Sequence, residues 1–369
     1  MKKRIVIVST YPAQGSKNIG DKLITNRLIN AISEFGDYDF DIIWRAETWE
    51  TVKDVVLSAS HVFFACLAIR PKMHKIEYPY LKDVVESGVP FSVIAAGTAL
   101  NVGTISDIYS SFSTETRDLL KRVNEKATVA TTRGYLSQEA CHRLRLNKFI
   151  FSGDIAFYDS SRKGEEFRAC RKIKKIVISD PHRSGQYLES FSALYDGIVD
   201  LFPGADVVVA QHGINYDISA FCESRAVKTE KIYENSDSGL DIYDDADLHV
   251  GFRVHAHVSA LSRRVYSYLL EQDGRGCDYG LTINRKISVP NYPVQRAFLG
   301  LKSIAKMILR REMPTQGVVP ISPAQQLIAM IRADKELGFQ KFNGLEEQIE
   351  SFNRNNRKAI EVALSGPDL

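Results

Sequence analysis

The chain alternates between short, strongly hydrophobic runs and longer segments in which hydrophobic residues recur every three or four positions. The first run, residues 4–9 (RIVIVS), is rich in β-branched residues and is typical of a buried strand. A glycine-containing loop follows, and an amphipathic helix is predicted from about residue 20 to 35. Its hydrophobic positions have helical spacing: Leu23, Ile24, Leu28, Ile29 and Ile32.

The same alternation continues through the first half of the chain. Further strands are predicted near residues 40–44, 61–66, 91–96, 127–131 and 148–151, and helices near 48–58, 80–87, 114–124 and 134–144. Repeated strand–helix units are typical of a parallel sheet covered by helices on both faces.

A polar, charged segment at residues 159–171 interrupts this pattern and is interpreted as a linker. Strands are then predicted near 175–179, 206–210, 228–233, 248–251 and 265–269, with helices near 186–201, 218–224, 240–245 and 255–262. The sequence therefore predicts two parallel-sheet domains facing a cleft, at residues 1–160 and 172–290.

Residues 291–369 are predicted to be a helical extension, with amphipathic helices near 323–337 and 345–364. We expect these helices to pack outside the second core. The pattern also leaves open a tail that packs across both domains, or one that forms a homo-oligomer contact.

Composition narrows the class of protein. The chain has 369 residues, of which 44% are hydrophobic and 25% charged, and its net charge of +3 is too small to indicate nucleic acid as a partner. The five cysteines form no CxxC pair, which argues against disulfides and structural zinc. With no signal-peptide pattern and no hydrophobic run of transmembrane length, we expect a cytoplasmic protein.

Candidate site residues lie just after predicted strands, because ligands bind beyond the carboxyl ends of parallel strands. In the first half, Asn18, Gly20 and Asp21 stand where the first helix begins, and either Asn18 or Asp21 could instead cap that helix. Arg133 follows a buried strand and opens a helix. Its guanidinium suits a phosphate or carboxylate, or else a surface salt bridge.

In the second half, His182 and Arg183 follow one strand and His212 follows the next. Arg253 and His255 lie in the turn after the strand at 248–251, where they place a permanent cation beside a group that can transfer a proton. Each histidine could instead be a hydrogen-bonded structural group. No metal is expected, because the HxH spacings of this segment lack a clear third ligand.

Four segments resemble the polysaccharide pyruvyl transferase family, in the order in which that family has them. They are NIGD at 18–21, TTRGYLSQEACHRL at 131–144, SGDIAF at 152–157 and DLHVGFRVHAHVSAL at 247–261. One departure lies after the third strand, where the family often has a glycine cluster and this chain reads FFACLA at 63–68.

The resemblance implies two Rossmann-like domains similar to those of GT-B glycosyltransferases. It also implies transfer of the enolpyruvyl group of phosphoenolpyruvate to two hydroxyls of a sugar or lipid-linked glycan, without a cofactor. Site roles carry over to Asp21, Arg133, Arg253 and His255. A lipid-linked acceptor would leave room for a peripheral position at the inner face of the membrane.

Two alternatives stay open. One is a GT-B-like glycosyltransferase that binds a nucleotide sugar near residues 212–215 and 271–276. The other is a non-catalytic protein that binds glycans or anions, which the missing glycine cluster favours and the retained Arg133, Arg253 and His255 oppose.

Overall fold

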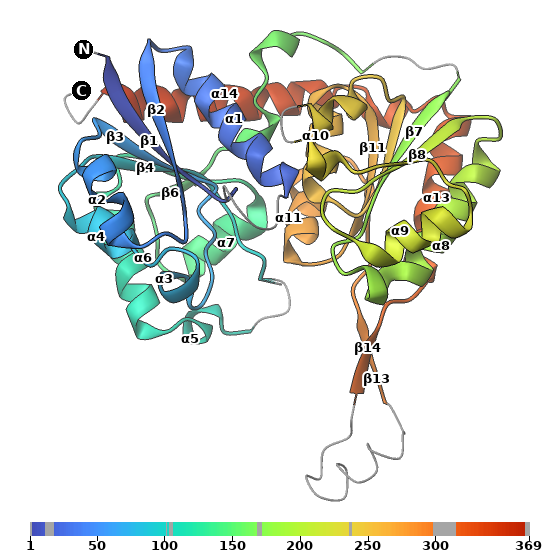
Figure 1. Cartoon of the computed structure of the whole chain (residues 1–369), viewed down its shortest axis with the longest axis horizontal. Coiled ribbons are helices and arrows are strands. Elements are labelled where there is room, and N and C mark those ends of the chain that lie inside the picture. Colours follow the sequence, from blue (N-terminus) through green and yellow to red (C-terminus); the bar gives the residue numbers. More distant parts are fainter. Residues whose placement is uncertain are drawn as a thin grey trace, which may run out of the picture.

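The computed structural model describes residues 2–11, 18–100, 102, 106–167, 172–235, 238–297 and 315–365. It consists of two sheet-and-helix halves that lie side by side (Figure 1). Each half contains a six-stranded sheet in which all neighbouring strands are parallel. The predicted fold class, two Rossmann-like parallel-sheet domains with C-terminal helices, is therefore confirmed.

The first sheet has the strand order β2-β1-β3-β4-β5-β6. Its strands are β1 (Lys3–Ser9), β2 (Tyr38–Trp44), β3 (His61–Ala65), β4 (Phe91–Ala96), β5 (Ala130–Thr132) and β6 (Phe149–Phe151). The helices between them are α1 (Ile19–Ser33), α2 (Trp49–Leu57), α3 (Met73–Ile76), α4 (Leu81–Glu86), α5 (Ile108–Ser111), α6 (Thr114–Lys126) and α7 (Tyr135–Arg143). Buried strands such as β3 and β4 are hydrophobic on both faces because helices cover both sides of the sheet.

The second sheet has the order β12-β11-β10-β7-β8-β9. Its strands are β7 (Lys175–Ser179), β8 (Asp206–Ala210), β9 (Thr229–Glu230), β10 (Leu248–Gly251), β11 (Tyr266–Glu271) and β12 (Ser288–Pro290). Its helices are α8 (Ser184–Leu201), α9 (Tyr216–Ser224), α10 (Val254–Ser262) and α11 (Gly274–Thr282). Short 3-10 helices are η1 (Ile155–Phe157) and η2 (Ser160–Arg162) between the sheets, then η3 (Ile232–Glu234) and η4 (Gly239–Tyr243). The proposed domain boundaries at residues 160, 172 and 290 stay a prediction.

The C-terminal region differs from the prediction in one respect. Residues just after 291 are not helical, because β13 (Val294–Ala297) and β14 (Thr315–Val318) form an antiparallel pair that projects from the second half (Figure 1). The helix α13 (Ser322–Glu336) does pack on the second half, against α8, β11 and β12.

The last helix, α14 (Leu345–Ser365), contacts both halves, so of the arrangements that the sequence left open it has the one that packs across both domains. Near its start, the Gln348 side-chain amide donates to the Thr282 carbonyl oxygen (2.9 Å). Further along, the Asn356 amide donates to the Gly153 carbonyl oxygen of the first half (3.2 Å). The helix therefore ties the two sheets together. None of the described helices combines the length and the hydropathy needed to cross a membrane.

Candidate functional site

A pocket at the carboxyl ends of strands from both sheets gathers six of the nine residues proposed from the sequence: Asn18, Arg133, His182, His212, Arg253 and His255. Residues from the segment after β11 complete its lining, notably Gln272, Asp273 and Arg275. Asp21, Gly20 and Arg183 do not line it. Three guanidinium groups and one carboxylate, that of Asp273, line this basic pocket, and the carboxylates of Asp180 and Asp278 lie next to Arg253 and Arg133.

Arg133 is a buried cation, not a surface one. It follows β5, is only 8% exposed, and its Nη2 donates to the Thr98 carbonyl oxygen (3.1 Å). Burial alone would lower its pKa, but the acidic groups of Tyr279, Asp154 and Asp278 hold the pKa above its ordinary value. Its buried Nε finds no hydrogen-bond partner among the described residues. An anion in the pocket would supply the missing acceptor.

Asp278 explains how the second half holds Arg133 in place. This carboxylate on α11 accepts from the Leu136 backbone N–H (2.8 Å) and the Ser137 hydroxyl (2.5 Å), so it caps the N-terminus of α7 in the first half. Its Oδ2 lies 4.0 Å from Nε of Arg133. Gly134 makes this approach feasible, because a Cβ there would lie 2.2 Å from the Asp278 carboxylate.

Arg253 already forms an ion pair with Asp180, so only part of its guanidinium is available to a ligand. Its Nε and Nη2 each donate to a carboxylate oxygen of Asp180, both at 2.9 Å, and Asp180 is fully buried. Although burial acts in the opposite direction, Arg253 keeps the pKa of Asp180 below its ordinary value. A ligand would therefore meet only the remaining N–H groups of Arg253, and the paired carboxylate fixes the plane of the guanidinium.

His255 lies in the first turn of α10 and borders the pocket. Its buried Nε2 has no hydrogen-bond partner among the described residues. Burial, together with the nearby Arg133 and Arg275 guanidiniums, lowers the pKa of His255 to about 3, so the ring is neutral near pH 7 when no ligand is bound. Gly20 packs against this ring, where a Cβ would lie 2.4 Å from Nδ1. The role the structure gives Gly20 is close packing against His255.

The start of α1 separates two roles that the sequence left open. Asn18 is the N-cap, since its Oδ1 accepts from the Gly20 N–H (3.3 Å). Its amide also donates to the Asp21 carboxylate (3.3 Å). Burial raises the pKa of Asp21, against the opposing effect of Arg45 and Arg275. Asp21 is thus a carboxylate near the pocket whose affinity for a proton is increased.

The remaining predicted residues differ in how they meet the pocket. His212 is buried, its Nε2 lies 2.7 Å from the Tyr243 hydroxyl, and burial lowers its pKa to about 3. His182 is exposed, and its Nδ1 lies 3.3 Å from Nη1 of Arg253. Arg183 is exposed at the N-cap of α8 and lies outside the pocket lining.

Gln272, Asp273 and Arg275 were missed as parts of this pocket. They stand at the start of α11, a helix that the sequence pattern did not predict. Gln272 donates to the Phe252 carbonyl oxygen (2.8 Å) and accepts from the His182 N–H (3.0 Å). Arg275 donates to Asp273 through Nη2 (2.7 Å). In the sequence, residues 271–276 stand out only as the nucleotide position of the glycosyltransferase alternative.

A chain of buried hydrogen bonds supports the loop that carries Arg253. Ser179 Oγ accepts from the backbone N–H groups of Phe252 (3.1 Å) and Arg253 (3.3 Å), so its own proton must go to Nε2 of His249 (2.9 Å). His249 then carries its proton on Nδ1 and donates it to Ser267 Oγ (2.6 Å). Nδ1 of His257 also lies 2.7 Å from Ser267 Oγ, so both histidines are hydrogen-bonded to serines. The described residues hold no group of three or more potential metal ligands.

Replacing Ser179 with alanine should lower the free energy of unfolding by about 1–3 kcal/mol, because two buried N–H groups lose their acceptor. Chemical denaturation would measure this change, with the exposed Ser224→Ala as the matched control. Nitrogen NMR of wild-type protein should show the His249 proton on Nδ1. A proton on Nε2 would contradict the assigned direction of the chain.

The fold and this pocket define a two-sheet α/β protein with a basic pocket between its halves. The chain belongs to the polysaccharide pyruvyl transferase family, whose sequence model matches residues 18–273. That match covers more than half of the chain and includes every predicted site residue. The family supports a transferase that modifies polysaccharides. No curated protein sequence matches the chain.

Several solved structures align with most of the chain at very low identity. A putative UDP-N-acetylglucosamine 2-epimerase from Listeria monocytogenes aligns with 96% of this chain and 91% of its own, at 10% identity and a TM-score of 0.49. The UDP-GlcNAc 2-epimerase from Methanocaldococcus jannaschii aligns over 90% and 100%, at 10% identity and a TM-score of 0.44. The wall teichoic acid polymerase TagF aligns over 96% and 89%, at 10% identity and a TM-score of 0.42.

The missing glycine cluster leaves a visible trace in the backbone. Cys66, directly after β3, has a φ of 55°, in the left-handed region that favours glycine. Its thiol lies 3.9 Å from the Asp154 carboxylate, and burial raises the pKa of the thiol well above its ordinary value. The chain thus makes a glycine-like turn here with a cysteine, and that thiol stays protonated.

Proposed function

We propose that this protein transfers the enolpyruvyl group of phosphoenolpyruvate to two hydroxyls of one sugar, forming a cyclic ketal and releasing phosphate. The observation that supports this best is the pair of buried atoms without partners, Arg133 Nε and His255 Nε2, at one pocket that also contains Arg253 and Arg275. Such a pocket suits a small donor with up to three negative charges.

Different arginines would bind the two anionic ends of the donor. Arg133, buried and held by Asp278, would bind one anionic group, and the free N–H groups of Arg253 would bind the other. Asn18 and Gln272 offer polar groups that could orient the donor. These guanidiniums neutralise the phosphate, so the proposal needs no metal or cofactor.

The reaction balances without any further reactant. A proton added to C3 of phosphoenolpyruvate turns the methylene into a methyl group and makes C2 electrophilic. One sugar hydroxyl then bonds to C2, phosphate leaves, and the second hydroxyl closes the ketal. The two hydroxyl protons account for the proton on C3 and the one on hydrogen phosphate.

His255 is the proposed acid for C3, and the bound donor is what would charge it. In the empty pocket its pKa is about 3, because it is buried beside arginines. A donor with up to three negative charges offsets those arginines and should raise this pKa. Asp21, whose pKa is raised by burial, would take a hydroxyl proton or orient the sugar.

Donor identity can be tested by thermal shift. Phosphoenolpyruvate at 100 times its Kd should stabilise the folded protein by about 2.7 kcal/mol, whereas UDP, GDP and CMP sugars should leave the melting temperature unchanged. Stabilisation by a nucleotide sugar alone would favour the glycosyltransferase alternative. Stabilisation by inorganic phosphate as strong as that by phosphoenolpyruvate would favour a non-catalytic anion-binding protein.

The acceptor and its location are also proposals. A glycan attached to a lipid would bring the protein to the inner face of the membrane. Sedimentation with vesicles that contain anionic lipid would test this position, and protein that stays in the supernatant would argue for a free acceptor.

A further inference from the structure

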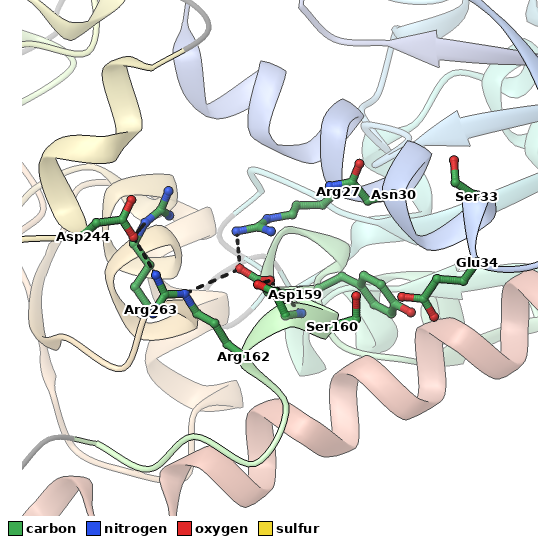
Figure 2. Close-up of a pocket in the computed structure, with 11 residues that line it drawn as sticks. Arg27, Asn30, Ser33, Glu34, Asp159, Ser160, Arg162, Asp244 and Arg263 are labelled. Atoms are coloured by element: carbon green, nitrogen blue, oxygen red, sulfur yellow. Dashed lines mark hydrogen bonds and ion pairs between the residues drawn. The ribbon is translucent and has the colours of Figure 1, made fainter.

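A second, larger hollow lies away from the basic pocket, between α1, the segment after β6 and the second half of the chain (Figure 2). Its volume is about 540 Å³, within the usual range for ligand sites. Arg27 and Asn30 come from α1, Ser160 from η2, and Arg263 follows α10. A smaller hollow of about 200 Å³ shares Arg27, Asn30 and Arg263 with it. We call the two together the α1 groove.

The α1 groove extends toward the basic pocket. Its smaller part reaches Ile19 and Lys22 at the start of α1, and Asn18, the preceding residue, lines the basic pocket. The positions 19, 22, 26, 30 and 33 recur every three or four residues and so share one face of the helix. The 15 residues of α1 span about 22 Å. That is far longer than a single sugar ring needs.

The charges of the larger hollow are balanced. Arg27 pairs with Asp159 (2.9 Å), and Asp244 receives hydrogen bonds from Arg162 (2.7 Å) and Arg263 (2.9 Å), as Figure 2 shows. With Glu34, three carboxylates face three guanidiniums. This lining gives no net attraction for an anion, in contrast to the basic pocket.

The chemistry of the lining matches a neutral molecule with many hydroxyls. Apart from Tyr158, every residue around the larger hollow is polar or charged, and several carry an amide or hydroxyl group. Arg27 borders both hollows, and its buried Nε lacks a hydrogen-bond partner among the residues that the structure describes. An unpaired buried N–H is costly, and a sugar hydroxyl would satisfy it.

We propose that the acceptor is a neutral oligosaccharide chain, with its reacting sugar at the basic pocket and its neighbouring units along the α1 groove. This inference rests on the proposed function, which places the reacting sugar beside His255. Binding along the α1 groove would make the enzyme selective for acceptor length, because a monosaccharide or disaccharide would reach only the basic pocket.

The test fills the groove without touching the basic pocket. Asn30 is exposed on α1, so Asn30→Trp should block the groove and leave the fold intact. Lys121→Trp, at an exposed position of α6 in the first half, is the matched control. Ser33→Trp, exposed at the far end of α1, is a second blocking variant in case the first fails to fold. The probe is a printed array of bacterial oligosaccharides with their mono- and disaccharide fragments.

Wild-type protein and Lys121→Trp should bind neutral oligosaccharides on the array, and Asn30→Trp should bind them at least about tenfold more weakly. Phosphoenolpyruvate should stabilise all the variants equally. Unchanged array binding by both blocking variants, preference for charged glycans, or no binding by wild-type protein would each overturn the inference. Array binding needs no turnover, so it tests the groove separately from the reaction. If the blocking variants lose glycan binding but phosphoenolpyruvate stabilises none of the proteins, the proposed function is rejected and glycan binding in the α1 groove is retained.

Discussion

His255→Gln should lower turnover by ~10²-fold or more while donor affinity stays within a few-fold of wild type. Glutamine keeps much of the size and hydrogen-bonding capacity of histidine, but it cannot exchange a proton near neutral pH. The ring borders the basic pocket, and its buried Nε2 has no hydrogen-bond partner among the described residues. Steady-state phosphate release and donor titration would measure the two quantities separately.

The proposed role of His255 also predicts the direction in which turnover changes with pH. The charged imidazolium is the acid, so turnover should fall as the pH rises through the pKa of His255 in the donor complex. That pKa should exceed the value of about 3 in the empty pocket, and NMR titration with and without phosphoenolpyruvate would show the difference. Since donor binding raises the pKa, binding takes up a proton and weakens as the pH rises.

The control for this variant is His142→Gln, at an exposed histidine of α7. It should keep wild-type turnover and the same fall in turnover at high pH. A His255→Gln enzyme with near-normal turnover and an unchanged fall in turnover at high pH would rule out His255 as the proton donor. The proton donor would then have to be sought at His182, since His212 is bonded to Tyr243.

Arg133→Ala should weaken phosphoenolpyruvate binding by ~2–4 kcal/mol, roughly 30- to 1000-fold, because a buried charge-assisted contact is lost. The same change leaves the buried carboxylate of Asp278 without its nearby cation, so we also expect lower stability. Arg133→Lys separates the two effects. Lysine keeps the charge that Asp278 needs but lacks the planar fork, so affinity should still fall at least about tenfold.

Isothermal titration calorimetry below the melting temperature of each variant would measure the donor affinity. Arg122→Ala is the control, because Arg122 pairs with Glu86 at an exposed site and its loss should change neither quantity by much. A folded Arg133→Lys or Arg133→Ala protein with wild-type affinity would remove Arg133 from the donor site.

The sequence predicted the elements that depend on hydrophobic pattern alone. Strands such as β1, β7 and β10 are continuous hydrophobic runs, so their positions and the parallel sheets could be predicted. The segments directly after β5 and β10 then supplied Arg133, Arg253 and His255. These residues meet at one pocket because the carboxyl ends of both sheets face each other.

The helix α11 could not be predicted, because its glycines are poor helix formers. Packing requires them: a Cβ at Gly274 would lie 2.2 Å from the Leu100 carbonyl oxygen, and one at Gly276 would lie 2.8 Å from Cα of Glu271. Arg275 and Asp278 on this helix were missed for that reason. No local pattern could show that Asp278 caps a helix in the other half of the chain.

The central claim is tested most directly by analysing the products formed from phosphoenolpyruvate and a panel of glycan acceptors. The account predicts that phosphate is released only when an acceptor is present, and that the acceptor gains one ketal-linked pyruvate per phosphate released. Phosphate release without a modified glycan, or transfer of a sugar from a nucleotide donor by the same protein, would contradict it.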